Sequence, residues 1–334
     1  MKRSVAVILL TLALFAATAH AQVQYAIAVD GDRDAVNDGL EQELLVKFAP
    51  VFMVAAKECD GLPAEFARNL NKPKVSLRNG TIYGQVFKND AVDGPGTFLE
   101  VHYYDLWARD CGRAGHDLDP EHVSVLVGAV SLDEPAANWK ALYWYAAAHE
   151  GTVCDASSGA RALSLEAETH GATIWVSRGK HGSFLSESRC SLGCGSDRCV
   201  DVKPMPYANL INIGEPGAPL NGAVWAQSSV WTLKSKMTPD FTGAVVARLD
   251  DAADDRIVSV NAPMPPTKAV ILSGNSSLTG VLVGNESAGK ALLIGGEAAA
   301  KAAGKGAGKG LRLSGRSLWV VGRALGRVFG FRTK

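Results

Sequence analysis

The stretch that decides the fold is Gly115-His116-Asp117-Leu118-Asp119-Pro120-Glu121-His122, which leads into the apolar run 123–130. Two imidazoles and three carboxylates precede a segment that is typical of a buried strand. Asp119, Glu121 and Val123 have the same parity, so on a strand their side chains share one face. Carboxylates on an apolar face are costly to bury unless a cation or a base accompanies them. We therefore expect a functional site where this strand begins.

Short apolar runs separated by Gly, Asn, Asp and Pro continue on both sides of this stretch, as in proteins built from strands and turns. The strands that we expect are 81–87, 98–104, 123–130, 141–148, 172–177, 224–230 and 243–249. Residues 40–48 form an amphipathic pattern that ends before Pro50, which predicts a helix. The fold class predicted is mainly β, an antiparallel β-sandwich with a few short helices, over residues 22–255. Residues 256–300 are rich in Gly, Ser and Asn and are expected to form additional strands or a linker.

The first 21 residues have the pattern of a secretory signal peptide. Lys2 and Arg3 precede an apolar run from Val5 to Ala17, and Ala19-His20-Ala21 matches a cleavage site. We therefore expect an exported protein, periplasmic or extracellular. Disulfides are the expected use of the six cysteines in an oxidising compartment, with 15 possible pairings. They are Cys59, Cys111, Cys154, Cys190, Cys194 and Cys199.

Charge is distributed unevenly along the chain, although the formal net charge is zero. Residues 301–334 contain nine Lys and Arg residues and no acid. Removing these nine and the two bases of the first 21 residues from the total of 34 leaves 23 basic residues against 34 acidic ones. On a helical wheel the tail arginines gather opposite Leu, Val and Phe, as in a basic amphipathic helix. The tail is expected to contact an anionic membrane or surface, or else to dock on the acidic body or remain disordered.

Two other segments resemble ligand-binding motifs. Asp30–Glu41 has oxygen-bearing side chains at positions 1, 3, 5, 9 and 12, as in a calcium-binding EF-hand loop. Ala35 stands where the loop needs glycine, and a strand rather than a helix is expected before it, so a solvated acidic turn capping the next helix is the preferred interpretation. Gly284–Lys290 matches Gly-x4-Gly-Lys, but Ala291 replaces the Ser or Thr of a P-loop. We expect neither a nucleotide nor nucleic acid as a partner.

The opening stretch contains the best candidates for metal ligands. His116, on a turn that begins at glycine, can reach the same point as Asp119 and Glu121, with Asp110 or Asp105 as an upstream carboxylate. One imidazole with several carboxylates suits magnesium, calcium or manganese better than zinc. Two further histidines, His149 and His181, stand in loops at the ends of expected strands beside glycines. They are the candidates for catalytic residues, and a backbone-capping role is the alternative for each.

The opening stretch resembles segments of two known protein families. The pattern Gly-His-x-x-Asp-x-Glu-His-Val at 115–123 resembles the Gly-His-Arg-His-Asp-Trp-Glu-His-Val signature of the necrosis- and ethylene-inducing-like proteins. It is also similar to the Asp-Trp-Glu-His segment of the vacuolar protein sorting 62-related family. Three more segments resemble that second family in order over about residues 41–190: 47–52, His149-Glu150-Gly151 and 176–184.

The resemblance implies a β-sandwich with a divalent cation bound by the signature His, Asp and Glu. Those roles would fall on His116, Asp119 and Glu121, with Asp110 or Asp105 as the upstream aspartate. Pro120 replaces the signature Trp, and Asp117-Leu118 replaces Arg-His, so the metal-ligand pattern is retained better than the cytolytic signature.

Three hypotheses about function follow. The first is an exported β-sandwich protein that binds a divalent cation and a membrane or surface ligand. The second is a metal-dependent hydrolase in which His149 or His181 acts as acid or base. The third is a structural envelope protein stabilised by disulfides. The sequence leaves the oligomeric state, the disulfide pairing and the identity of the metal open.

Overall fold

The computed structural model describes residues 29–112, 115–152, 154–191 and 197–260, which form a mainly β fold with short helices. The predicted signal peptide, the tail 301–334 and the segment Gly284–Lys290 lie outside the described residues. The strands are β1 Val51–Ala55, β2 Ala64–Phe66, β3 Val75–Arg78, β4 Ile82–Lys88, β5 Thr97–Arg109, β6 Asp117–Ala129, β7 Lys140–Ala146, β8 Ser158–Arg161, β9 Thr173–Val176, β10 Ser183–Phe184, β11 Val202–Pro204, β12 Leu210–Asn212, β13 Gly214–Glu215, β14 Ala218–Pro219 and β15 Val258–Ser259. The helices are α2 Asp38–Lys47, η1 Ala136–Asn138, η2 Leu163–Leu165, α3 Glu187–Cys190, η3 Val224–Gln227, α4 Leu233–Lys236 and α5 Gly243–Asp250.

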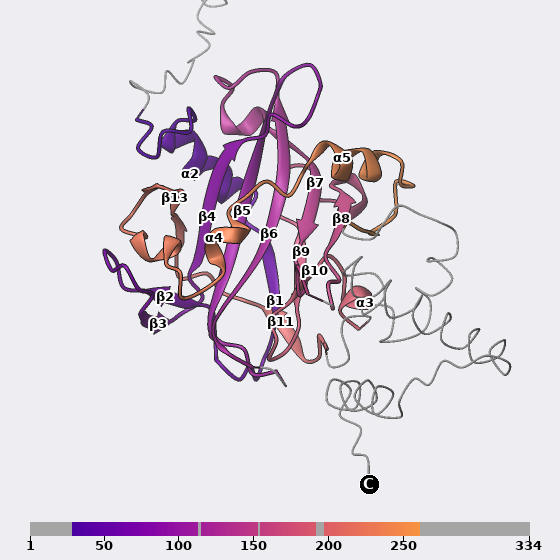
Figure 1. The fold of residues 1–334 in the computed structure, drawn as a ribbon. Helices are drawn as coiled ribbons and strands as arrows, with labels where there is room; N and C mark the ends of the chain where they lie inside the picture. The colour runs from indigo at the N-terminus through magenta and orange to yellow at the C-terminus, as the bar shows by residue number, and fades with distance from the viewer. Residues whose placement is uncertain (1–28, 113–114, 153, 192–196, 261–334) are drawn as a thin grey trace, which may run out of the picture.

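Two sheets make up the body of the molecule. The larger sheet has the strand order β12-β4-β5-β6-β7-β8-β15, and the smaller has the order β10-β9-β1-β11. In Figure 1 the long strands of the larger sheet run side by side, with α2 next to β4 and α5 next to β8. The pairings are antiparallel except for two parallel ones, β1 with β9 and β12 with β4. The predicted mainly β class with few short helices is confirmed.

One hydrophobic core lies between the two sheets. Phe52 of β1 and Ile174 of β9 are buried in the same cluster as Val101 of β5 and Val125 of β6. Odd-numbered residues of β5 and β6 therefore face the smaller sheet, because side chains alternate along a strand. The even-numbered residues face the other way and are covered by the segment 223–241, which adds Trp225, Trp231 and other apolar side chains to a second cluster.

Helix α2 covers the end of the core near β4. Asn37 caps its first turn, because the side-chain oxygen of Asn37 accepts hydrogen bonds from the amides of Gly39 and Leu40. At the other end, Lys47 donates to three main-chain carbonyls around η1, those of Ala136, Ala137 and Trp139, at 2.6–3.0 Å. The helix predicted over 40–48 is confirmed, with its observed start two residues earlier.

Two of the predicted strands are wrong. Residues 224–230 contain the short helix η3, and residues 243–249 belong to α5. In η3 the neighbouring residues Trp225 and Ala226 are both buried, which a half-buried strand does not allow. In α5 the side chains of Val245, Val246 and Leu249 pack on one cluster, and a spacing of three to four residues is that of a helix.

Candidate functional site

The hairpin of β5 and β6 positions the predicted site residues. Each strand is 13 residues long, and Asp119 pairs with Trp107 while Glu121 pairs with Asp105 across the hairpin. Asp119 and Glu121 are both buried, as the parity of their positions predicted. Their strand continues into Val123 and Val125 of the central core, so the carboxylates mark the end of the apolar face.

A tight turn between the strands brings Asp110 and His116 to Asp119. The amide of Asp110 donates to the carbonyl oxygen of His116 at 2.8 Å. Gly115 allows this approach, because a Cβ at that position would overlap with the carbonyl oxygen of Asp110. One possible ligand atom from each of Asp110, His116 and Asp119 lies within 4.8 Å of the others. The side chain of His116 is 56% exposed, so solvent reaches the group from one side.

This donor set fits a hard divalent cation. Ligand atoms within 4.8 Å of one another are close enough to surround one ion, since oxygen ligands of calcium lie about 2.4 Å from the metal. The imidazole Nε2 of His116 lies 4.0 Å from Oδ1 of Asp119, too far for a hydrogen bond and suitable for two ligands of one ion. The Oδ1 oxygen of Asp119 is thus directed to the turn.

His181 supports Asp119 from the interior. Its Nδ1 lies 2.9 Å from Oδ2 of Asp119, and its Nε2 lies 3.6 Å from Oε1 of Glu58. The ring stacks on Trp107 with centroids 3.9 Å apart and planes 6° apart. Burial lowers the pKa of His181, but the hydrogen bond to Asp119 and the nearby carboxylate of Glu58 outweigh it and raise the pKa to about 9. His181 therefore holds one carboxylate oxygen of Asp119 in place.

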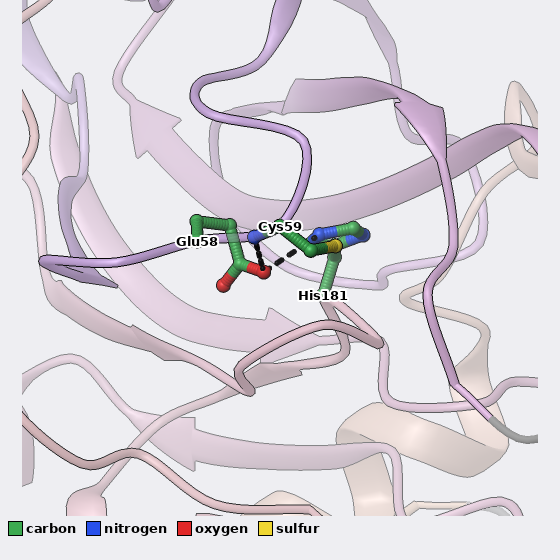
Figure 2. A group of neighbouring side chains, drawn as sticks. All are labelled: Glu58, Cys59 and His181. Atoms are coloured by element: carbon green, nitrogen blue, oxygen red, sulfur yellow. Dashed lines mark hydrogen bonds and ion pairs between the residues drawn. The ribbon is translucent and has the colours of Figure 1, made fainter.

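Cys59 lies beside this histidine without being a metal ligand. Figure 2 shows Glu58, Cys59 and His181 together, with Oε1 of Glu58 between the amide of Cys59 and the imidazole. The sulfur of Cys59 is bonded to Cys111, so it offers no thiolate. The disulfide instead joins the chain at Glu58 to the turn at Asp110.

Glu121 is not part of the group formed by Asp110, His116 and Asp119. Burial raises its pKa well above the ordinary value, although the ammonium of Lys236 opposes this. Burial also raises the pKa of its cross-strand neighbour Asp105 to about 7, against a hydrogen bond that Trp107 donates to Asp105 at 3.0 Å. Glu121 and Asp105 thus form a second layer of carboxyl groups behind Asp119.

His149, the other candidate catalytic residue, has a separate partner. Its Nε2 lies 2.8 Å from Oδ2 of Asp197, and Lys180 makes an ion pair with the other oxygen of Asp197 at 3.4 Å. Gly182 lies between the two histidines, since a Cβ built on it would be 3.4 Å from the ring of His149. The structure therefore brings His181 to Asp119, whereas His149 is held by Asp197.

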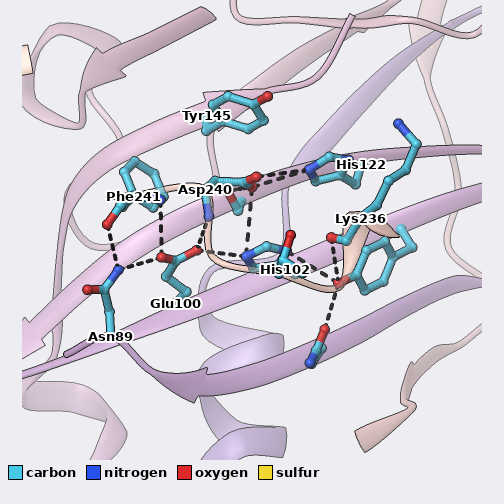
Figure 3. A network of polar contacts seen from close by, with 12 residues as sticks. Asn89, Glu100, His102, His122, Tyr145, Lys236, Asp240 and Phe241 are labelled. Carbon is cyan, nitrogen blue, oxygen red and sulfur yellow. Dashed lines mark hydrogen bonds and ion pairs between the residues drawn. The ribbon is translucent and has the colours of Figure 1, made fainter. Parts of the chain in front are cut away.

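A second buried histidine network was missed by sequence reasoning. It lies on the outer face of the larger sheet, where His102 and His122 stack 5.8 Å apart and both face Asp240 (Figure 3). Glu100 accepts from His102 at 2.8 Å and from the amides of Asp240 and Phe241. Although these ligand atoms are close enough for an ion, they already bond to one another, so the network anchors the segment 223–241 to the sheet.

Disulfides agree with the expectation from the cysteine count. Cys59 is bonded to Cys111 and Cys190 to Cys199, and Cys154 is also disulfide-bonded. These bonds are consistent with export. Among the described residues, no helix has the length and apolar character needed to cross a membrane.

Comparisons with known proteins found similarity in structure only. No family model and no curated protein matches the sequence. The structural neighbours are necrosis- and ethylene-inducing-like proteins. A structure described as a toxin fold for microbial attack and plant defense is 16% identical with a TM-score of 0.31, over 55% of this chain and 82% of that one. The non-toxic protein HaNLP3 is 14% identical with a TM-score of 0.35, over 65% and 98% of the two chains.

A third neighbour is NLPPya in complex with mannosamine, 15% identical with a TM-score of 0.31, over 55% of this chain and 81% of that one. The resemblance to the vacuolar protein sorting 62-related family is not shown by these comparisons. Similarity at this level carries no argument about what the present chain binds, so its function has to be argued from its own site.

Proposed function

We propose that this protein is an exported β-sandwich protein that binds one divalent cation through Asp110, His116 and Asp119. The observation that carries the proposal is the closeness of their ligand atoms, all within 4.8 Å, at the solvent-exposed turn of the β5–β6 hairpin. Two carboxylates and one imidazole suit magnesium, calcium or manganese. The resemblance also implies Glu121 as a ligand, but in this proposal Glu121 lies next to the group and does not bind the ion directly.

The arrangement around Asp119 favours a preorganised site. His181 and Trp107 fix the carboxylate from inside, so that Asp119 loses little freedom when an ion binds. The same contacts argue against His181 as a general acid or base, because the side chain is buried and both ring nitrogens face carboxylates. A binding function is therefore favoured over the metal-dependent hydrolase.

Titration of the full chain with MnCl₂ by calorimetry tests the cation proposal. We expect one manganese ion at this group, and at least a tenfold loss of affinity in His116→Ala and in Asp119→Asn. His170→Ala removes an exposed histidine that belongs to no such group and serves as the matched control. Equal manganese binding by wild type and both site variants would sink the proposal. Absence of bound ion, with unchanged stability of His116→Ala, would favour the structural envelope protein instead.

The second part of the proposal concerns the basic tail. We propose that residues 301–334 attach the protein to an anionic membrane or surface, since nine basic residues without an acid follow an acidic body. Vesicles that contain phosphatidylserine should bind the full chain more strongly than a chain ending at residue 300, and 0.5 M NaCl should abolish the difference. Identical binding by the two chains would contradict this part of the proposal and leave the cation site untouched.

A further inference from the structure

The loop Asp30–Glu41 forms a second acidic cluster, remote in sequence from the β5–β6 turn. Figure 1 places it at the N-terminal side of α2, next to β13. Carboxylate oxygens of Asp30, Asp32 and Asp38 lie within 4.8 Å of one another, and so do those of Asp32, Asp34 and Glu41. Asp32 belongs to both groups, so five carboxylates converge around its side chain.

Two of these carboxylates are buried without enough partners. Asp32 is 4% exposed, and neither of its carboxylate oxygens has a hydrogen-bond partner. Glu41 is fully buried, with Oε2 accepting from Nδ2 of Asn212 at 2.5 Å and Oε1 without a partner. The expectation of a solvated acidic turn is therefore wrong for Asp32 and Glu41. Buried polar oxygens without partners are costly, and each calls for a ligand.

Among the described residues, basic side chains offset little of this charge, although Lys88 opposes the raised pKa of Asp34. Within the described part of the chain, no lysine, arginine or histidine forms an ion pair with any of the five carboxylates. Burial and neighbouring carboxylates raise the pKa of Asp32 to about 7 and that of Glu41 to about 9. Glu215 adds a further acid near Asp32. A bound cation would offset this acidic charge.

The backbone of the loop makes the sharp turn of an EF-hand loop, although alanine stands where such loops usually have glycine. An EF-hand loop makes its sharp turn at position 6, usually with glycine. Ala35 occupies that position here and adopts φ 66°, in the left-handed region that glycine favours. The carboxylate of Asp30 accepts from the amides of Arg33 and Ala35 at 2.6 and 3.1 Å, which closes the turn. Helix α2 then begins at Asp38, so that Glu41 points back from its first turn.

We propose that the loop Asp30–Glu41 binds one calcium ion, with Asp32 as the central ligand and Glu41 as the ligand supplied by α2. The donors are all oxygens, and their spacing of up to 4.8 Å is about twice the calcium–oxygen distance of about 2.4 Å. Calcium accepts six to eight oxygen ligands in flexible geometry, whereas magnesium requires a near-ideal octahedron and retains several waters. Five carboxylates on one short loop therefore suit calcium.

Binding at this loop would stabilise one edge of the molecule. Glu41 bonds to Asn212 on β12, the edge strand of the larger sheet, and α2 packs its buried leucines on the common core. The ion would thus hold the loop, the helix and the edge strand in one arrangement. This site is separate from the cation site at Asp110, His116 and Asp119, and either can exist without the other.

The experiment compares thermal unfolding and calorimetric binding of the full chain with CaCl₂ alone and with EGTA. We expect calcium to raise the melting temperature of the wild-type protein, and this rise to be lost in Asp32→Asn and Glu41→Gln, with at least a hundredfold loss of affinity. In EGTA the two variants should be at least as stable as the wild type, because each replaces a buried carboxyl by a neutral amide. Asp93→Asn, at an exposed acid elsewhere, is the matched control.

The variant Asp119→Asn separates the two cation sites, since it should keep the calcium-dependent rise in melting temperature. If Asp32→Asn does not fold, Asp30→Asn removes a half-buried ligand of the same group and should weaken calcium binding. Calcium binding that is unchanged in Asp32→Asn and Glu41→Gln would overturn the inference. So would a wild-type melting temperature that is the same in CaCl₂ and in EGTA, because a calcium ion bound at the folded loop has to stabilise it.

Discussion

The two carboxylate oxygens of Asp119 have different neighbours. One is held by the buried side chain of His181, and the other faces His116 and the open turn. In metal sites generally, removing a side chain that orients a ligating carboxylate lowers the affinity for the metal about tenfold or more. The division between a buried support and an exposed ligand is visible only in three dimensions, because 62 positions separate Asp119 from His181.

Asp240 makes stability depend on pH through the outer histidine network. Burial alone would raise its pKa, but His122 and His102 outweigh burial and lower it below its ordinary value of 3.8. Burial lowers the pKa of His102, but Asp240 and Glu100 raise it above the ordinary 6.5. The carboxylate thus contributes stability that is lost as pH falls through its lowered pKa. The imidazolium contributes stability that is lost as pH rises through its raised pKa.

Asp240→Asn should therefore destabilise the protein most between about pH 4 and pH 6.5, by about 3 kcal/mol, as expected when one partner of a buried charge pair is removed. The difference from wild type should shrink at pH 3 and at pH 9. Urea unfolding at pH 3, 5.5 and 9 measures this. Asp254→Asn, at a mostly exposed acid paired with Arg161, should show no such maximum. A destabilisation equal at all three values of pH would contradict the assignment of charge to the network.

The sequence predicted the group at the β5–β6 turn, but it did not predict the histidine network around Asp240. His116 and Asp119 stand three residues apart in a recognisable pattern, and the parity of Asp119 and Glu121 correctly placed them on one buried face. Asp240 is 118 positions from His122, and no periodicity links them. A local signal did exist in the polar residues Glu100, His102 and Ser124, which have even numbers within the segments 99–103 and 123–127, where the odd-numbered residues are apolar.

At the scale of elements, strands with clear alternation were predictable and the segment after residue 220 was not. The predictions for β4, β7 and β9 are confirmed within two residues, whereas β5 ends five residues later and β6 begins six residues earlier than predicted. Valine-rich segments at 224–230 and 243–249 suggested strands by composition, yet tertiary contacts with the outer face of the sheet select helices there. Capping by the Thr242 side chain, which accepts from the amide of Val245, could have indicated the start of α5.

The disulfide Cys59–Cys111 joins elements that are 52 positions apart, whereas Cys190–Cys199 spans nine. Replacing both cysteines of the longer bridge by serine should cost about 4 kcal/mol of unfolding free energy, and about 3 kcal/mol for the shorter one, because a longer loop loses more entropy on closure. Only the first pair of substitutions should also weaken cation binding, since Cys111 adjoins Asp110 and Cys59 adjoins Glu58.

Chemical denaturation and manganese titration of the two double variants check these expectations, with the shorter bridge as the matched control. Equal loss of manganese affinity in both variants would mean that the bridges act only on global stability. Unchanged affinity in Cys59→Ser/Cys111→Ser would show that the turn keeps its geometry without the bridge.

At the scale of the whole molecule, both sheets contribute to one core. Phe52→Ala removes a fully buried ring between them and should cost about 4 kcal/mol, as for other large-to-small changes in cores. Both sheets should then melt together at a lower temperature. Val51→Ala, at the exposed neighbouring position, should change stability by less than about 1 kcal/mol. Calorimetric unfolding in two separated steps would contradict the single core.

The long hairpin of β5 and β6 has a consequence for how such a chain can evolve. Its two faces carry different chemistry, the acid group with the apolar core on one and the histidine network on the other. A single inserted or deleted residue within β6 would exchange the faces, turning valines toward the segment 223–241 and His122 toward the smaller sheet. Length changes should therefore accumulate in the turn between Asp110 and His116 and be absent from the strands. Descendants of this chain are free to remodel the side chains of this turn, while the register that supports them is inherited unchanged.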